Sequence, residues 1–251
     1  MSEQFGTWWL ESVIAVGGLG EIWRASRGAE VVALKRLHTH LLRNDAVRAQ
    51  FIIEQQLATE LPRHPNLVHA LEAGAIADRP YLALELAPGE DLRRAGRMVS
   101  RARVLAIALA TCEAAAHLHD CGFVHGDINP GNLVVSTDHV TLIDLGIARK
   151  ISAAGTVRGT HAYMAPEQVR GEPWVPATDV FAIGVVLWEL TAGGRLFHRG
   201  PPWLSMAAVV EAQAPPLDDP ELDAIAQAAL IKDPARRIAS ARDLAERLGA
   251  L

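Results

Sequence analysis

The sequence predicts an α+β protein, in which a small strand-rich part around one helix is followed by a larger, mainly helical part. Short β-branched segments dominate the first 87 residues, and segments rich in Ala and Leu dominate the remainder. Half of the 251 residues are hydrophobic, which is enough for one large core or two smaller ones. We therefore expect one domain over residues 1–87 and a second over residues 88–251.

Two segments of the first part have the composition of β-strands. Residues 30–37 (EVVALKRL) are rich in β-branched and aliphatic side chains and follow a turn-rich stretch, and residues 80–86 (PYLALEL) form a second such segment. Pro88 and Gly89 then break the strand and mark a short connector. Nearer the N-terminus, the Gly-rich stretch VIAVGGLGEIW lies between two apolar flanks that also predict strands.

A helix is predicted between these strands, and it carries one charge on its apolar face. Positions 47, 51, 54, 58 and 61 follow 4-3-4-3 spacing, and Glu54 is the only charged residue among them. Lys35 shares a strand face with Ala33, where an ammonium group needs an anionic partner. We expect Lys35 and Glu54 to form an ion pair, although a Glu54 that faces water at the rim of the stripe would also fit the pattern.

The second part predicts helices over roughly residues 99–120, 179–192, 204–213, 221–232 and 240–250. Ser240 is suited to cap the last of them. The longest apolar run, Val180–Trp188, is about half a bilayer span and predicts a buried helix, so we expect no membrane span. The first residues lack a basic region followed by an apolar run, which argues against a secretory signal.

Charge and cysteine content exclude further classes of protein. The formal net charge is −5, so no global basic field favours nucleic acid as a partner. Cys112 and Cys121 are nine positions apart, which on one helix is about 13 Å and too far for a disulfide. Reduced thiols predict a cytoplasmic protein. The basic cluster over residues 93–103 is expected to be a solvated surface, with a docking patch as the less favoured alternative.

The segment HGDINPGN, residues 125–132, places the carboxylate of Asp127 five positions before the amide of Asn132. Asp, Asn, Pro and Gly are common turn residues, so the segment alone also fits an ordinary turn. The strands NLVV and VTLI follow, separated by STDH, and an antiparallel hairpin would bring Asn132 beside Asp144 at its open end. Carboxylate and amide oxygens there would suit a Mg²⁺ that also takes phosphate oxygens.

Taken in order, these segments resemble the protein kinase family over nearly the whole chain. The matching motifs are AVGGLGEI, VALK, HGDINPGN, DLG, GTHAYMAPE and DVFAIGVVLWEL. The resemblance implies a bilobal protein-kinase-like fold, with ATP and Mg²⁺ as cofactors and transfer of the γ-phosphate to hydroxyl groups of a protein substrate. The Gly-Thr pair before AYMAPE is similar to that of Ser/Thr kinases and favours Ser or Thr as the acceptor.

The resemblance also implies roles for individual residues. Asp127 would be the catalytic base, Lys35 with its partner Glu54 would hold the α- and β-phosphates, and Asn132 and Asp144 would bind Mg²⁺. The Gly-rich loop, the hinge and the adenine sandwich would contribute Ile14, Gly17, Gly18, Leu19, Gly20, Ile22, Ala33, Glu85, Ala87 and Leu133.

Two positions of the catalytic loop depart from the family pattern. Gly126 replaces an Arg that commonly pairs with a phosphorylated activation loop, so we expect no strict dependence on such phosphorylation. Asn129 replaces the Lys that contacts the γ-phosphate, and it brings a hydrogen-bond donor but no positive charge. His125 is expected to pack and hydrogen-bond beneath the loop rather than to shuttle protons.

These departures leave three functions open. The first is an active Ser/Thr protein kinase, the second is a pseudokinase or weakly active nucleotide-binding regulator, and the third is a kinase of a small metabolite. The loop is also similar to that of aminoglycoside and choline kinases, whereas the APE motif and Arg237, the expected partner of Glu167, favour a protein kinase. The lack of an appended sensor leads us to expect a soluble kinase that takes its input from a partner protein. The acceptor and the oligomeric state are not predicted.

Overall fold

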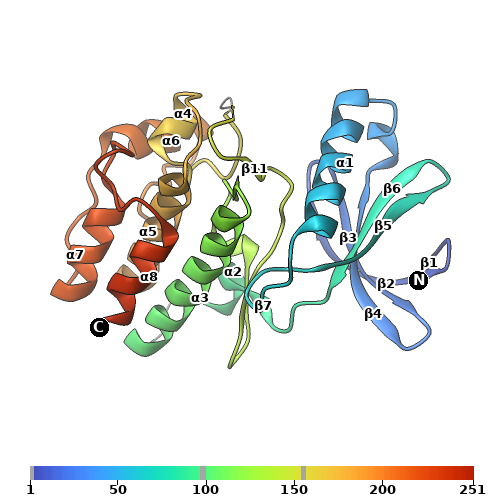
Figure 1. Ribbon diagram of the computed structural model, residues 1–251, viewed down its shortest axis with the longest axis horizontal. Helices are drawn as coiled ribbons and strands as arrows, with labels where there is room; N and C mark the ends of the chain where they lie inside the picture. Colours follow the sequence, from blue (N-terminus) through green and yellow to red (C-terminus); the bar gives the residue numbers. More distant parts are fainter. Residues whose placement is uncertain (1–2, 97–99, 154–156) are drawn as a thin grey trace. The chain divides into compact units, whose positions relative to one another are not determined.

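The computed structural model describes residues 3–96, 100–153 and 157–251, which form two compact units, Met1–Pro88 and Gly89–Leu251. The first unit contains an antiparallel sheet and one long helix, and the second contains most of the helices (Figure 1). The predicted fold class is therefore confirmed. Among the described residues, no helix is long and apolar enough to cross a membrane.

The sheet of the first unit has six antiparallel strands in the order β1-β2-β3-β4-β6-β5. Val32 and Leu34 of β4 face a core that includes Trp8, whereas Ala33 and Lys35 face the opposite side of the strand. This alternation places Lys35 outside the apolar core. The strand bounds, from β1 to β6, are Glu3–Phe5, Trp8–Val16, Gly20–Arg27, Glu30–Leu37, Ala70–Ile76 and Arg79–Glu85.

The helix of the first unit is α1, Asp45–Glu60, which follows a 3₁₀ turn at Thr39–Leu41. Asn44 caps it by accepting a hydrogen bond from the backbone N–H of Val47. The helix packs against β5 and β6, and Glu54 lies on its buried face with an exposed fraction of 4%. The alternative in which Glu54 faces water is therefore wrong.

The second unit is built around α5, Pro176–Ala192, which packs against α3, Arg101–Asp120, and α8, Ala241–Gly249. Every side chain of α5 from Ala177 to Leu190 is buried, as its apolar sequence predicts. The remaining helices, α2, α4, α6 and α7, span Leu92–Ala95, Pro166–Val169, Pro202–Glu211 and Pro220–Ala229.

Short strands flank residues 125–132 and the segment that follows them. β9 (Leu133–Val135) and β10 (Val140–Leu142) form the predicted antiparallel hairpin. The backbone N–H of Ile143 donates to the carbonyl of Asn132 at 2.8 Å. This bond at the open end of the hairpin holds Asn132 beside the residue that precedes Asp144. A 3₁₀ turn, Pro130–Asn132, precedes β9, and the other strands are β7 (Glu90–Asp91), β8 (Phe123–Val124) and β11 (Arg149–Lys150).

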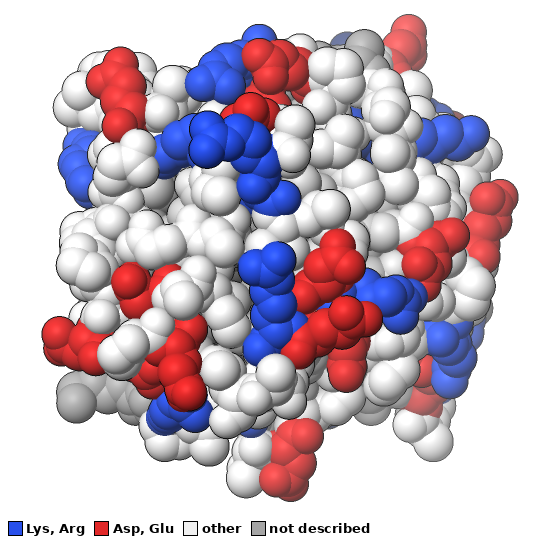
Figure 2. All heavy atoms as spheres, turned by 60° about the vertical axis from the view of Figure 1, so that its left-hand side comes forward, with Lys and Arg blue, Asp and Glu red and all other residues white. Residues whose placement is uncertain are grey.

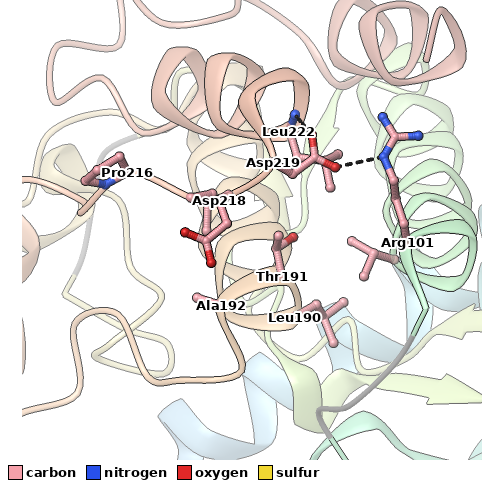
Figure 3. Close-up of a pocket in the computed structure, with 10 residues that line it drawn as sticks. Arg101, Leu190, Thr191, Ala192, Pro216, Asp218, Asp219 and Leu222 are labelled. Carbon is pink, nitrogen blue, oxygen red and sulfur yellow. Dashed lines mark hydrogen bonds and ion pairs between the residues drawn. The ribbon is translucent and has the colours of Figure 1, made fainter.

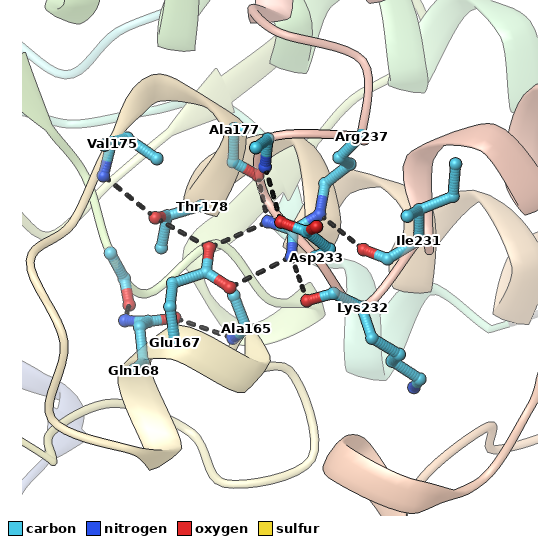
Figure 4. A network of polar contacts seen from close by, with 12 residues as sticks. Ala165, Glu167, Gln168, Val175, Ala177, Thr178, Ile231, Lys232, Asp233 and Arg237 are labelled. Carbon is cyan, nitrogen blue, oxygen red and sulfur yellow. Dashed lines mark hydrogen bonds and ion pairs between the residues drawn. The ribbon is translucent and has the colours of Figure 1, made fainter.

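A buried ion pair joins two distant segments of the second unit (Figure 4). Arg237 Nη1 lies 2.7 Å from Glu167 Oε1, and Nη2 lies 2.9 Å from Oε2. The hydroxyl of Thr178 donates to the same carboxylate at 3.0 Å. The guanidinium also donates to the backbone carbonyls of Ala177, Ile231 and Lys232. This bidentate geometry fixes the segment around Glu167 on the helices of the second unit.

Charged side chains of both signs are interspersed on the face shown in Figure 2, and no single extended basic field covers it. The described Arg residues of the basic cluster have partners within the chain, and Arg93 and Arg94 lie 3.7 and 3.4 Å from Asp91. Arg101 bonds Asp219 and Glu221, and Arg103 donates to the carbonyl of Thr137 at 3.1 Å. Residues 97–99 of this cluster lie outside the described part.

Candidate active site

Lys35 and Glu54 form a close ion pair within the first unit. Lys35 Nζ lies 2.6 Å from Glu54 Oε1, with side-chain exposed fractions of 12% and 5%. β4 supplies the Lys and α1 supplies the Glu. The Glu54 carboxylate compensates the Lys35 ammonium for its lost hydration and restricts the flexible Lys side chain. The ammonium is then a positioned point charge that suits a phosphate.

The Gly-rich segment is the tight turn between β2 and β3. The N–H of Gly17 donates to the carbonyl of Gly20 at 2.8 Å, and a ring nitrogen of His38 lies 2.8 Å from the carbonyl of Gly17. A Cβ at Gly20 would lie 2.3 Å from the carbonyl oxygen of Arg36, so only glycine fits there. Gly18 has open space around it, which permits close approach of a ligand to the backbone.

The other residues expected around a nucleotide are placed on both units. Ile14, Ile22 and Ala33 lie on β2, β3 and β4. Glu85 ends β6, and its N–H already donates to the carbonyl of His69 at 2.9 Å. The second unit contains Leu133, Asn132 and Asp144, and the first unit also contains Leu19 and Ala87.

Both carboxylate oxygens of Asp127 accept hydrogen bonds. Oδ1 accepts from the backbone N–H of Thr160 at 2.7 Å, and Oδ2 accepts from Asn132 Nδ2 at 3.1 Å. Burial raises the pKa of Asp127, the bonds from Thr160 oppose this rise, and the nearby Asp144 carboxylate adds to it. The loop therefore fixes the orientation of this carboxylate and makes it a stronger base than an exposed Asp.

Asn132 and Asp144 present oxygen donors of the kind that Mg²⁺ prefers. Nδ2 of Asn132 also donates to the carbonyl of Asp127 at 2.9 Å. This bond fixes the orientation of the amide, so Oδ1 is the atom that would bind a metal ion. Asp144 has a φ of 69°, a strained conformation for a residue with a side chain, and its Oδ1 accepts from Gly146 N–H at 3.2 Å. This donor set fits Mg²⁺. The described residues contain no cluster of three or more His, Cys, Asp or Glu that could form another metal site.

Asn129 is held inside the loop. Its Nδ2 donates to the carbonyl of Asp127, and its Oδ1 accepts from the N–H of Gly131, both at 2.9 Å. The residue is 4% exposed. Because both polar atoms of the amide bond to the backbone of the loop, Asn129 shapes the loop in this structure.

A buried carboxylate that the sequence analysis missed supports the loop from below. Asp179 accepts hydrogen bonds from His119 Nε2 at 2.9 Å and from the backbone N–H groups of His125 and Gly126 at 2.9 and 2.8 Å. Burial alone would raise the pKa of Asp179, but these bonds lower it below the usual range. His125 Nδ1 accepts from the N–H of Asp127, so His125 does hydrogen-bond beneath the loop as predicted. The available signal was a lone Asp in the apolar helix ATDVFAIG.

The space beside Gly126 is filled by Trp174, which the sequence analysis also missed. Gly126 has a φ of 77°, and a Cβ there would lie 2.1 Å from Cζ3 of the Trp174 ring. The ring is fully buried, and the guanidinium of Arg149 stacks on it at 4.2 Å from the centroid. The departure at Gly126 is therefore a packing requirement of this chain.

Comparison with known proteins decides which family this arrangement represents. The family model for the protein kinase domain matches residues 9–247. The chain belongs to the protein kinase family. This confirms the resemblance seen in the motifs.

Several bacterial relatives resemble this protein kinase domain along nearly its whole length. It is 32% identical to a probable serine/threonine-protein kinase of Corynebacterium efficiens, over 94% of the chain and 40% of the relative. It is also 32% identical to the serine/threonine-protein kinase PknA of Mycobacterium tuberculosis, over 98% of the chain and 61% of the relative. A probable serine/threonine-protein kinase of Streptomyces coelicolor is 32% identical over 95% of the chain and 39% of the relative. The kinase chain thus spans roughly two to three fifths of the length of these relatives.

Proposed function

We propose that this protein kinase domain transfers the γ-phosphate of ATP to Ser or Thr hydroxyls of a protein substrate. The observation that carries the proposal is the Asp127 carboxylate, which Thr160 and Asn132 hold in one orientation within the loop. The relatives at 32% identity are named serine/threonine-protein kinases, which supports the choice of acceptor.

The nucleotide would be held by one cation and by oxygen ligands of Mg²⁺. Lys35, oriented by Glu54, would contact the α- and β-phosphates, and Asn132 and Asp144 would hold Mg²⁺. When bound, Mg²⁺ supplies charge neutralisation for the phosphate oxygens. The remaining contacts would come from the Gly-rich turn, the hinge and the apolar residues around adenine: Ile14, Gly17, Gly18, Leu19, Gly20, Ile22, Ala33, Glu85, Ala87 and Leu133.

Asp127 would orient the acceptor hydroxyl and take its proton. Its bonds to Thr160 and Asn132 hold it in place before the substrate arrives, so little reorganisation is needed at the time of reaction. Because burial raises the pKa of Asp127, the low-pH limb of kcat/KM should lie above the ordinary titration range of an Asp. The free thiols of Cys112 and Cys121 support a reducing compartment, the cytoplasm, as the place of action.

One observation favours a second function, that of a weakly active or non-catalytic nucleotide-binding regulator. Asn129 stands where the family has a Lys, and its amide is engaged within the loop. The transition state then lacks one positive charge. A small-molecule kinase is less favoured, because the buried Glu167–Arg237 pair belongs to the protein-kinase form of the activation segment.

Transfer of labelled γ-phosphate to a generic protein substrate tests the proposal. Asp127→Asn and Lys35→Met should each lower the rate by about 100-fold or more. Asp138→Asn makes the same change as the first variant at an exposed hairpin turn and should leave the rate unchanged.

Calorimetry with ATP and Mg²⁺ separates the two functions. Nucleotide binding without transfer by the wild-type chain would favour the regulator, and the absence of Mg²⁺-dependent binding would overturn both.

A further inference from the structure

The second unit contains hollows of different chemical character. One, of about 410 Å³, lies where α3, the end of α5 and the start of α7 meet (Figure 3). Its cation, Arg101, bonds Asp219 at 2.8 Å and Glu221 at 2.6 Å, and Asp218 adds another carboxylate. Because this cation is already paired with two acidic groups, the hollow offers no distinct recognition chemistry.

Another hollow, of about 300 Å³, is lined by basic groups and contains no Asp or Glu among its described lining residues. Its polar lining includes Arg93, Asn129, Thr160, His161, Arg195 and His198. Two of these residues bond directly to Asp127, since Thr160 N–H donates to its carboxylate and Asn129 Nδ2 donates to its carbonyl. The hollow therefore begins next to the candidate catalytic carboxylate.

Arg93 of α2 lies against the catalytic loop. A Cβ at Gly131 would come within 2.2 to 2.6 Å of its guanidinium atoms, so the guanidinium packs directly on the backbone there. Its carboxylate neighbour, Asp91, is 3.7 Å away, and the side chain remains 58% exposed. More than half of the Arg93 side chain therefore remains accessible to a ligand.

Arg195 is the second cation of the hollow, and it is held in place from behind. Its Nη1 contacts the hydroxyl of Tyr163 and lies 3.3 Å from Oε2 of buried Glu189. The side chain is 33% exposed. An Arg anchored through one nitrogen presents the rest of its planar fork to a ligand with little further loss of side-chain freedom.

We propose that this hollow, the anion pocket, binds an anionic side chain of the protein substrate near the acceptor hydroxyl. The inference rests on the proposed function and narrows its substrate class to sequences that carry a carboxylate or a phosphorylated residue close to the acceptor. Two Arg forks match the oxygen geometry of either group, and His161 and His198 add further polar contacts. The chain has a net charge of −5, yet the described lining of this hollow contains no Asp or Glu. The lining is therefore complementary to an anion.

Paired peptides test the proposal. Each peptide carries one Ser acceptor, and one flanking position at a time is Glu, phosphoserine or neutral Gln. Binding is measured by fluorescence anisotropy and transfer by kcat/KM, with the complete chain. At one flank, an anionic residue should bind about tenfold more tightly than Gln, as expected for charge-assisted hydrogen bonds, and the preference should weaken with added salt. The Glu and phosphoserine peptides separate the two sources of negative charge.

Two neighbouring arginines provide a matched pair of variants. Arg93→Gln should reduce the anionic preference to below about threefold, because one of the two forks is removed. Arg94→Gln removes an equal charge from the same helix at a side chain that is 72% exposed and is not among the lining residues. It should keep the preference. His198→Gln is a further variant in the lining, and it should weaken the preference less than Arg93→Gln.

The outcomes distinguish the pocket from the activity. Equal binding of anionic and neutral peptides, no detectable binding of either, or equal loss in Arg93→Gln and Arg94→Gln would overturn the anion pocket. Anionic preference in binding without any transfer would support the pocket and refute the proposed function. Transfer that is equally fast to anionic and neutral peptides, with equal binding of both, would support the proposed function and refute the pocket.

Discussion

Asp127 lies in the loop and Asp179 bonds the backbone of the same loop, and their surroundings shift their pKa values in opposite directions. Asp179 is fully buried and accepts from His119 and from two backbone N–H groups, so its pKa is lowered despite burial. Burial raises the pKa of Asp127, the nearby Asp144 carboxylate adds to this rise, and the hydrogen bonds from Thr160 do not offset it. Burial opposes ionisation of both carboxylates, so the comparison teaches that donors and neighbouring charges decide which of two buried carboxylates becomes a structural anion and which remains a base.

The same contrast extends to the regions that contain the two residues. Two supports of the second unit, Asp179 beneath the loop and the Glu167–Arg237 pair, are buried and closely hydrogen-bonded. The loop itself opens onto the anion pocket. Changes in the support should therefore alter stability, whereas changes on the open side should alter substrate preference.

The largest expected effect comes from breaking the buried ion pair. Arg237→Met should lower the free energy of unfolding by about 3–5 kcal/mol, because Glu167 would remain buried without its cation. Arg236→Met removes a neighbouring exposed Arg and should change the free energy of unfolding by less than about 0.5 kcal/mol. Denaturant unfolding of both variants measures the difference, and equal stability would contradict a supporting role for Arg237.

Asp179→Asn should lower the free energy of unfolding by about 2–4 kcal/mol, because an amide cannot accept as well from three donors and leaves buried N–H groups unsatisfied. Asp218→Asn makes the same change at an exposed site and serves as the control.

The effect of Asp179→Asn should also depend on pH. A lowered pKa means that the stabilisation by Asp179 is complete above the pKa of an unfolded Asp and is lost as the pH falls through the folded value. The two unfolding curves should therefore converge in acid. A constant difference down to the lowest pH would mean that the charge is not the cause.

Gly126→Ala should destabilise the chain by about 1–3 kcal/mol, because its methyl group would overlap the Trp174 ring and its φ is positive. Gly122→Ala is a matched control, since Gly122 has a φ of 86° but no atom within 4 Å of the place that a methyl group would occupy. The additional loss of unfolding free energy in Gly126→Ala, relative to Gly122→Ala, measures the packing against Trp174. Similar costs at both glycines would show that backbone conformation alone selects glycine.

The smallest effect is expected from removing activation-segment hydroxyls. Ser152→Ala combined with Thr156→Ala should change activity by less than about twofold, because the Arg that commonly pairs with a phosphorylated loop is replaced by Gly126. The N–H of Ser152 already donates to the carbonyl of Trp174 at 2.8 Å, whereas Thr156 lies outside the described residues. Phosphotransfer assays measure the effect, and complete loss of activity would contradict the prediction.

Much of the fold was predictable because it depends on local patterns. β4 spans the predicted residues 30–37, Ser240 caps α8 by accepting from Asp243 N–H, and α5 is as buried as its composition implies. The four-residue helices α2 and α4 were not predicted, since they are too short for a hydrophobic period to appear.

The sequence by itself determined the family, the order of its motifs and the residues that carry charge, because residue types and spacing are contained in the chain. Only the tertiary structure decided how those groups behave. It brought Asp179 under the loop, closed the space at Gly126 with Trp174, engaged both polar atoms of Asn129, and placed Arg93 and Arg195 around one hollow. Protonation and recognition depend on which donors and charges meet in space, and residues far apart in the sequence supply them.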